Sequence, residues 1–347
     1  MKNYYAVIMA GGIGSRFWPI SRTAHPKQFI DILGTGKTLI QNTYDRFLKI
    51  VPAENIFIVT NDIYKSLVKE QLPDIDESQI LGEPVMRNTA PCIAYASHKI
   101  SMLNPDASII VAPSDHLILN TEGFVNDINR ALEVTQKQNC LITLGIKPSR
   151  PDTGYGYIQF NSQTIEDNFY KVKTFTEKPN LELAKTFIQS GDFLWNAGIF
   201  VWSAAAILSA FEKHLPDINE IFKEGESVFN TFEENAFIQN AYYQCTNISI
   251  DYGIMEKADN VYVLPTDFGW SDLGTWASVY ELAEKDYVGN AVIPSERVIM
   301  YDSSNCMVNV PEGKLVILQG LEDYIVVEAN NTLMVCQRSE EQNRCAA

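Results

Sequence analysis

Apolar and polar positions alternate along the first half of the chain in a pattern typical of strands followed by helices. Short apolar runs predict buried parallel strands, and they stand at 4–10, 56–60, 79–83, 108–113 and 140–146. Between these runs apolar residues recur at helical spacing, in 39–50, 64–72, 90–103 and 124–138. Strands that alternate with helices in this way form βαβ units, so we expect an α/β fold with a doubly wound, mostly parallel sheet.

The rhythm changes after residue 150. The pattern predicts further strands at 155–160, 170–176 and 198–202, and further helices at 181–189 and 204–215. Residues 290–337 contain only short β-rich pieces with turn signals between them, and no long helix. We therefore expect two domains, a large one over 1–285 and a small β-rich one over 286–347.

The first predicted strand runs directly into a glycine-rich loop with Gly11, Gly12 and Gly14. Backbone N–H groups in such a loop can surround phosphate oxygens, and Arg16 and Lys27 add two cations nearby. The spacing excludes both a P-loop and the dinucleotide-binding G-x-G-x-x-G. A structural turn would explain one or two glycines but not three together with both cations, so the loop indicates nucleotide phosphate binding.

Two acidic residues stand where a magnesium ion could be held. Asp115 follows the strand at 108–113, and a residue just past a buried parallel strand faces the ligand crevice of an α/β sheet. Asp272 lies between Gly269 and Gly274, which would let its loop approach a substrate. From spacing alone, Asp115 could equally cap the next turn. One or two carboxylates plus phosphate oxygens are the usual Mg²⁺ ligands, so the pair is a candidate metal site.

Other polar segments are weak signals when each is taken alone. The Gly-Tyr-Gly at 154–156 suits any hairpin, and Glu177-Lys178 is, when taken alone, more typical of a solvated ion pair before a helix. Asn88 and Thr89 could simply cap the helix that follows them. Asp251 likewise could cap a helix, and the residues do not separate this role from a binding role.

Composition narrows the class of protein. The formal net charge of −16 argues against non-specific nucleic-acid binding, and it requires local cations or a metal to attract an anionic substrate. The six scattered cysteines, with no C-x-x-C pair, are typical of buried fillers in a reducing compartment. Neither a signal peptide nor a membrane-length apolar stretch is present, so we expect a cytoplasmic protein without a membrane partner. A homodimer is compatible with the sequence, which does not set the oligomeric state.

The glycine loop carries a specific resemblance. Residues 10–22 (Ala-Gly-Gly-Ile-Gly-Ser-Arg-Phe-Trp-Pro-Ile-Ser-Arg) and 26–29 (Pro-Lys-Gln-Phe) resemble the signature of the sugar-1-phosphate nucleotidylyltransferases. The stretch 17–22 is most similar to the mannose-1-phosphate guanylyltransferase branch. Ser15 stands where the family often has Thr, and the serine keeps the side-chain hydroxyl. The resemblance covers 1–285 and implies a Rossmann-like sheet of the nucleotide-diphospho-sugar transferase type. For the tail it implies a small left-handed β-helix.

The resemblance also implies roles for individual residues. Those expected to bind the nucleotide are Ala10, Gly11, Gly12, Gly14, Ser15, Arg16, Lys27, Glu83, Asn88, Thr89, Ser114 and Asp115. Those expected to bind the sugar phosphate are Gly154, Glu177, Lys178, Asn196 and Asp251. The expected metal ligands are Asp115 and Asp272, and the expected catalytic set is Arg16, Lys27, Lys178, Asp115 and Asp272.

The implied reaction joins GTP and α-mannose 1-phosphate to give GDP-mannose and pyrophosphate, with Mg²⁺ as the cofactor. A sugar phosphate has a second pKa of roughly 6 and is mostly ionised at neutral pH, so no general base is needed. This agrees with the lack of a convincing His or Cys nucleophile arrangement in the sequence. Two alternatives stay open: the same chemistry with UTP or dTTP and glucose 1-phosphate, and a non-catalytic paralogue that binds sugar nucleotides and regulates a partner.

Overall fold

The computed structural model describes residues 3–12, 14–293 and 297–341, with the side chain of Ser15 left undescribed. The chain divides into two compact units. Unit 1 consists of Met1–Gly11, Tyr44–Pro113 and Ile118–Trp270. Unit 2 consists of Gly12–Thr43, Ser114–Leu117 and Ser271–Ala347, so most of the glycine-rich loop belongs with the C-terminal strands. The chain passes between the units near β5 (Leu117–Ile118) and β11 (Trp270–Ser271).

Unit 1 is built on one mixed sheet, whose described strands follow the order β3-β2-β1-β4-β9-β6-β10-β8-β7. β1 pairs in parallel with both β2 and β4, as the apolar runs predict, while β9 is antiparallel to β4 and β6. The strands are β1 (Tyr4–Met9), β2 (Ile56–Asn61), β3 (Ile80–Glu83), β4 (Ser108–Pro113), β6 (Leu141–Ile146), β7 (Gly156–Glu166), β8 (Phe169–Glu177), β9 (Phe193–Ser203) and β10 (Val261–Thr266).

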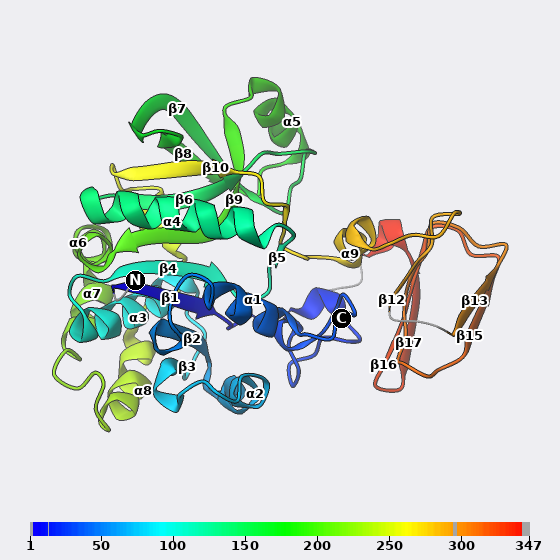
Figure 1. Ribbon diagram of the computed structural model, residues 1–347, viewed down its shortest axis with the longest axis horizontal. Coiled ribbons are helices and arrows are strands. Elements are labelled where there is room, and N and C mark those ends of the chain that lie inside the picture. The colour runs from blue at the N-terminus through cyan, green and yellow to red at the C-terminus, as the bar shows by residue number, and fades with distance from the viewer. Residues whose placement is uncertain (1–2, 13, 294–296, 342–347) are drawn as a thin grey trace. The chain divides into compact units, whose positions relative to one another are not determined.

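Helices pack on both faces of this sheet (Figure 1). Tyr5 and Val7 of β1 belong to the apolar cluster that includes α3, α6 and α7, while the alternate residues Ala6 and Ile8 are buried outside that cluster. The helices of unit 1 are α2 (Lys65–Gln71), α3 (Thr89–Leu103), α4 (Thr121–Lys137), α5 (Leu181–Ser190), α6 (Ala204–His214), α7 (Pro216–Lys223) and α8 (Glu234–Gln244), and α1 (Leu39–Phe47) crosses between the units.

The hydrophobic pattern located these elements to within a few residues, with two kinds of difference. β9 begins at Phe193, earlier than the predicted start at 198, because Trp195 is buried and its segment pairs with β6 and β7. The pattern gave no helix at α7 or α8 and no strand at β10. β10 carries Pro265, a residue that normally argues against a central strand.

Unit 2 contains two short 3₁₀ helices, η1 (Ser15–Phe17) and η2 (Lys27–Phe29). It also contains the α-helix α9 (Trp276–Leu282) and short strands at the C-terminal end. β12 (Ala291–Ile293), β14 (Met307–Asn309) and β16 (Tyr324–Ala329) run parallel, with β17 (Thr332–Gln337) antiparallel at the edge. β13 (Val298–Tyr301) and β15 (Val316–Gln319) form a second parallel ladder. Val298, Met300, Val316 and Leu318 pack on one core with Val308 and Val326, so each turn of chain closes over a shared apolar interior.

The described residues bear on two expectations from the sequence, one about membrane-spanning segments and one about the cysteines. Within the described residues, no helix has the length and apolar character needed to cross a membrane. The five described cysteines are buried and form no disulfide: Cys92, Cys140, Cys245, Cys306 and Cys336. Cys345 lies outside the described residues.

A buried ion pair joins α3 to the start of α8. The Lys99 ammonium lies 2.6 Å from Glu234 Oε2, and the Tyr95 hydroxyl donates to Glu234 Oε1 at 2.5 Å. The backbone N–H of Asn230 donates to the same carboxylate at 2.7 Å. Both charged side chains are almost fully buried, so each depends on the other to offset the loss of water.

We expect Glu234→Ala to lower the free energy of unfolding by about 3–5 kcal/mol, because it leaves the Lys99 ammonium buried without its counter-charge. Urea denaturation followed by circular dichroism measures this change. The double variant Lys99→Met with Glu234→Leu, which removes both charges, should recover most of the loss. A single variant within about 1 kcal/mol of the wild type would contradict the expectation.

Candidate functional site

The Lys27 ammonium is the centre of a polar cluster in unit 2. It lies 2.9 Å from Asp115 Oδ2 and donates to the backbone carbonyl of Asp272 at 2.7 Å. It also lies 5.6 Å from the centroid of the Phe17 ring, and the Lys27 residue is only 5% exposed. Segments that are far apart in the sequence, around residues 27, 115 and 272, therefore meet at one cation.

Glycine residues permit this close approach. Gly14 has a φ of +65°, and a Cβ there would lie 2.3 Å from the Cβ of Lys27. A Cβ on Gly274 would lie 2.6 Å from Asp272 Oδ2, and the Gly274 N–H donates to Asp272 Oδ1 at 3.0 Å. A larger side chain at either position would displace Lys27 or Asp272, so the two glycines fix the geometry of the cluster.

Electrostatics keep the Asp115 carboxylate ionised. Burial raises the pKa of Asp115, but the charges of Lys27 and His116 and the Lys27 hydrogen bond outweigh that effect and lower the pKa overall. The Asp115 carboxylate and the backbone carbonyl of Asp272 thus already face a positive charge. Hard oxygen donors of this kind are what Mg²⁺ prefers, so the residues present fit such an ion. No group of three or more His, Cys, Asp or Glu side chains converges anywhere in the described residues, so substrate phosphates and water would have to complete its ligand shell.

The rest of the glycine loop is held by side-chain to backbone bonds within unit 2. The buried Gln28 amide donates to the Gly12 carbonyl at 2.9 Å. Ser114 is buried, and its carbonyl accepts from the Thr43 hydroxyl at 3.1 Å. Arg16 is exposed in η1, whereas Lys27 is buried. Of the two cations expected at the loop, Arg16 is therefore the one that reaches solvent.

In unit 1, the Glu83 carboxyl group at the end of β3 lies close to the backbone of Gly11, which follows β1. Glu83 is 5% exposed, and its Oε1 has no hydrogen-bond partner. A Cβ on Gly11 would lie 3.3 Å from Glu83 Oε2, so the backbone that follows Ala10 passes close to the carboxyl group. Burial raises the pKa of Glu83 to about 7; the Tyr242 hydroxyl nearby lowers it in part, and the Asp62 charge adds to the rise. Tyr242 and Asp62 carried no signal in the sequence, because nothing in the pattern placed α8 against β3.

Asn88 and Thr89 have separate roles in the structure. Asn88 has a φ of 66° and its side chain accepts from the Thr89 N–H at 2.9 Å, which makes it the N-cap of α3. The Thr89 hydroxyl accepts from the N–H of Ile250 at 2.9 Å, and the N–H of Ala90 donates to the Ile248 carbonyl at 3.1 Å. The capping role foreseen for Asn88 is present, whereas Thr89 ties its segment to the one that precedes Asp251.

Three of the residues expected to bind the sugar phosphate form one cluster in unit 1. The Asn196 amide donates to Asp251 Oδ1 at 2.7 Å. Burial raises the pKa of Asp251 to about 6, and the negative charge of Glu177 adds to the rise. A Cβ on Gly156 would lie 2.6 Å from Glu177 Oε1 and 3.5 Å from the Cβ of Asn196. Glu177, Asn196 and Asp251 therefore line one region, and Gly156 is the glycine that allows them to approach.

Lys178 and Gly154 lie at the exposed margin of the same region. Lys178 has a φ of 43°, and its mostly exposed ammonium lies 3.8 Å from Glu177 Oε2. Asp251 bonds to Asn196 and not to Lys178 in the contacts that are described. Gly154 is exposed, and its N–H donates to Asp152 Oδ1 at 2.8 Å. The motif at 153–157 thus contributes a packing glycine that the sequence did not single out, in addition to Gly154.

Comparisons with known proteins place these features in context. A family model described as "Nucleotidyl transferase" matches residues 5–288, and one described as "MannoseP isomerase/GMP-like beta-helix domain" matches residues 296–343. "Mannose-1-phosphate guanylyltransferase" of Escherichia coli is 33% identical over 97% of this chain and 73% of its own length. "Alginate biosynthesis protein AlgA" of Pseudomonas aeruginosa is 35% identical over 97% of this chain and 70% of its own. The crystal structure of "mannose-1-phosphate geranyltransferase" from Thermus thermophilus is similar with a TM-score of 0.89 at 29% identity, covering 98% of this chain and 97% of that one.

The raised pKa of Glu83 predicts a pH-dependent stability. A carboxyl group with a pKa of about 7 in the folded state and 4.5 as its ordinary value stabilises the fold below pH 4.5, and this contribution is lost as the pH rises through 7. Glu83→Gln removes the titration, so without nucleotide it should exceed the wild type by only about 1 kcal/mol near pH 5 and by about 3 kcal/mol near pH 8.5.

Urea denaturation at the two pH values measures the difference between Glu83→Gln and the wild type. Glu54→Gln is the matched control, because Glu54 is exposed in the same unit and its substitution should have equal effects at both pH values. If Glu83→Gln also changes stability equally at both values, the Glu83 carboxyl group does not titrate near neutrality in the folded protein.

Proposed function

Because the chain belongs to the nucleotidyl transferase family, we propose that it transfers a guanylyl group from GTP to mannose 1-phosphate. The fold is that of a nucleotidyltransferase with a β-rich C-terminal domain. The observation that carries the proposal is the cluster in which Lys27 joins the Asp115 carboxylate to the Asp272 carbonyl. Such a cluster beside a glycine loop suits a reaction in which a polyphosphate must be held and its charge neutralised.

The reaction is an in-line displacement. An ionised phosphate oxygen of the sugar attacks the α-phosphorus of GTP, a new oxygen–phosphorus bond forms, and the bond from the α-phosphorus to the bridging oxygen breaks. Pyrophosphate leaves with the bond's electron pair. No proton has to move, since the sugar phosphate is ionised at neutral pH. The protein therefore acts by bringing two anions together and by stabilising the charge of the leaving group.

In unit 2, the glycine loop and Arg16 bind the triphosphate, with the loop N–H groups and the exposed guanidinium as donors. Asp115 and Asp272 would hold Mg²⁺, which when bound supplies a Lewis acid for the α-phosphate. Lys27 keeps these two segments at a fixed separation through its bonds to both. Its burial makes it an internal counter-charge for Asp115, and the exposed Arg16 is the cation of this segment that can face the polyphosphate.

In unit 1, the sugar phosphate and the base have separate binding groups. Asn196, Asp251 and Glu177 offer hydrogen-bond partners to sugar hydroxyls, and Lys178 meets the phosphate from its exposed position. Glu83 offers an unpartnered carboxyl oxygen next to Gly11. Guanine carries adjacent N–H donors that adenine lacks, and a carboxylate pairs with both, which supports guanine as the base.

Several finer features belong to the same proposal. Mg²⁺ is the divalent ion, the small domain is a left-handed β-helix that begins near residue 286, and the protein works in the cytoplasm. The parallel ladders of β12–β14–β16 and β13–β15 support the β-helix, and the absence of disulfides among the described cysteines supports a reducing compartment. The order of substrate binding and the number of subunits do not enter the proposal.

Pyrophosphate release with each of GTP, ATP, UTP and dTTP, and with either mannose 1-phosphate or glucose 1-phosphate, tests the reaction. We expect the highest kcat/KM for GTP with mannose 1-phosphate in the presence of Mg²⁺. A preference for UTP or dTTP would replace the guanylyl assignment with another member of the same chemistry. Nucleotide binding without any pyrophosphate release would favour the non-catalytic regulatory protein.

Asp115→Asn should lower kcat by roughly 10²-fold or more, because it removes the carboxylate charge that would hold Mg²⁺ at the reacting phosphates and that pairs with Lys27. Steady-state kinetics at saturating Mg²⁺ measure the change, and thermal unfolding shows that the variant is folded. Asp106→Asn, at an exposed position before β4, is the control and should behave like the wild type. A rate for Asp115→Asn within about tenfold of the wild type would count against its role as a metal ligand.

A further inference from the structure

We propose that Glu341, near the C-terminal end of the described chain, is a positioning residue that holds the nucleotide-binding loop in its active geometry. The proposal rests on the proposed function, because it assigns the triphosphate to the glycine loop. It involves only residues of unit 2. Glu341 does not touch the substrates in this scheme; it acts through α9 and the ring contacts that join α9 to η1.

The Glu341 carboxylate caps the N-terminus of α9. It accepts from the backbone N–H groups of Trp276 and of Ala277, the second at 3.1 Å, although it lies more than sixty residues further along the chain. Thr275 and Ser278 form a capping box at the same helix end. The first N–H groups of a helix have no partner inside it, so a carboxylate that binds two of them fixes where the helix begins. Glu341 is 7% exposed, so its contacts are largely shielded from water.

The helix end held by Glu341 is in contact with the glycine loop. The Trp276 ring is fully buried and packs edge-on against the Phe17 ring, with centroids 5.1 Å apart. Phe17 ends η1, which also contains Arg16, and its ring lies beneath the Lys27 ammonium at 5.6 Å. Lys27 in turn bonds to the Asp272 carbonyl, four residues before Trp276. A shift of the α9 end therefore moves both the ring that supports Lys27 and the loop that carries Asp272.

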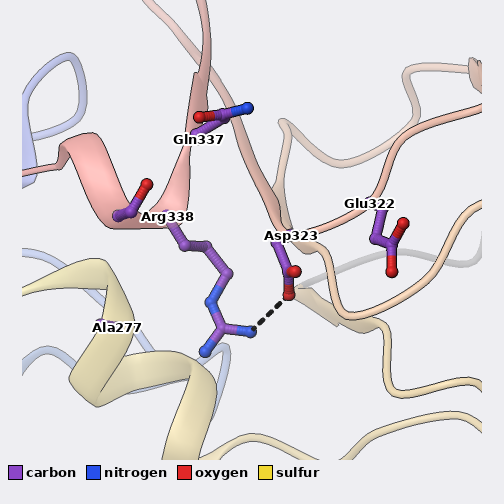
Figure 2. Close-up of a pocket in the computed structure, with 6 residues that line it drawn as sticks. Ala277, Glu322, Asp323, Gln337 and Arg338 are labelled. Atoms are coloured by element: carbon purple, nitrogen blue, oxygen red, sulfur yellow. Dashed lines mark ion pairs between the residues drawn. The ribbon is translucent and has the colours of Figure 1, made fainter.

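Arg338 anchors the segment that carries Glu341. Figure 2 shows its side chain extending toward Asp323, with which it forms an ion pair at 3.7 Å across a pocket of about 530 Å³. Its guanidinium lies 3.7 Å from the centroid of the Tyr280 ring and donates to the Asn305 carbonyl at 3.1 Å. The backbone N–H of Arg338 donates to the Asp323 carbonyl at 2.8 Å. Arg338 thus fixes the segment to the β-rich strands and to α9, three residues before Glu341 reaches the helix end.

Glu341 also attracts Arg16 by charge, and this attraction has the opposite effect on nucleotide affinity from its role as a helix cap. Burial raises the pKa of Glu341, whereas its two backbone hydrogen bonds and the charge of Arg16 lower it, so the guanidinium lies within electrostatic range. Removal of the carboxylate would free Arg16 for the triphosphate and tighten binding. Arg16 is exposed, however, and water screens its attraction to Glu341. This attraction therefore changes the affinity for the nucleotide by a factor of about five or less. The loss of two hydrogen bonds to a buried charge is the larger effect, so we expect weaker nucleotide binding.

Two variants separate position from charge. Glu341→Gln keeps the shape of the side chain but loses its charge and one acceptor oxygen. Glu341→Asp keeps the charge but is too short by one methylene to reach both N–H groups. If position governs, both variants weaken GTP binding by about tenfold, with Glu341→Asp no better than Glu341→Gln. Glu312→Gln, at an exposed position of the same unit, is the matched control and should leave binding unchanged.

The first measurement is hydrogen exchange by mass spectrometry on the full chain without nucleotide. Glu341→Gln should speed exchange in peptides covering 271–282 and 14–29, and leave the α3 peptide of unit 1 unchanged. Faster exchange confined to 271–282 would overturn the proposal, because the helix end would then not govern the loop. Equal acceleration in all peptides would also overturn it, since Glu341 would then support the whole fold. This readout does not depend on any substrate, so it stands even if GTP proves not to be the nucleotide.

The second measurement is the affinity for GTP by calorimetry, together with steady-state kinetics. A positioning role raises the Kd and KM for GTP and leaves the KM for mannose 1-phosphate within about twofold. The ratio of the variant's Kd for GTP to that of the wild type should be the same at high salt, because the effect does not come from an exposed ion pair that salt would screen. A lower kcat with both KM values unchanged would indicate a loss of folded enzyme and overturn the proposal. Tighter GTP binding in Glu341→Gln would show that the Arg16 charge governs, which also overturns it.

Discussion

The arrangement of unit 2 depends on two contacts of the Lys27 ammonium. One is the ion pair with the Asp115 carboxylate, and the other is the hydrogen bond to the Asp272 carbonyl. A buried lysine and a half-buried aspartate are each unfavourable alone, because burial removes water that stabilises their charges. As an ion pair, the two side chains offset this loss of solvation. With the Asp272 carbonyl, they hold three distant segments of the chain together. The glycines at 14 and 274 are a consequence, since any Cβ there would push into Lys27 or Asp272.

The same constraint explains how an acidic chain can handle polyphosphates. A net charge of −16 repels a nucleotide at long range, so binding has to come from a few cations and N–H groups at fixed positions. Lys27 is held inside the protein, while Arg16 remains exposed at the loop. In unit 1, burial raises the pKa values of Glu83 and Asp251, Oε1 of Glu83 has no hydrogen-bond partner, and Asp251 accepts from the Asn196 amide.

Capping contacts connect the small elements of unit 2 to the candidate site. α9 is a short helix, and helices of this length depend on partners at their ends more than on their own hydrogen bonds. Here the partner is a carboxylate from the far end of the described chain, and the next contact is the ring of Phe17 in the glycine loop. The β-rich strands therefore do more than extend the chain, because they hold the segment from which Glu341 reaches the helix.

By its hydrophobic pattern, the sequence alone predicted most of the alternating strands and helices of the first half of the chain, since apolar periodicity follows directly from which face of each element is buried. It also singled out the glycine loop, Asp115 and Asp272, because glycines and acidic residues beside buried strands are local signals. The roles of Thr89 and Asp251 could not be separated in this way, since their partners Ile250 and Asn196 are far away along the chain. Tyr242 and Glu341 carried no signal, and Gly156 only a weak one, for the same reason: their contacts are made by packing between distant segments. Which of these polar groups meet follows from the three-dimensional fold alone, because a side chain's partner depends on proximity in space, which local sequence does not encode.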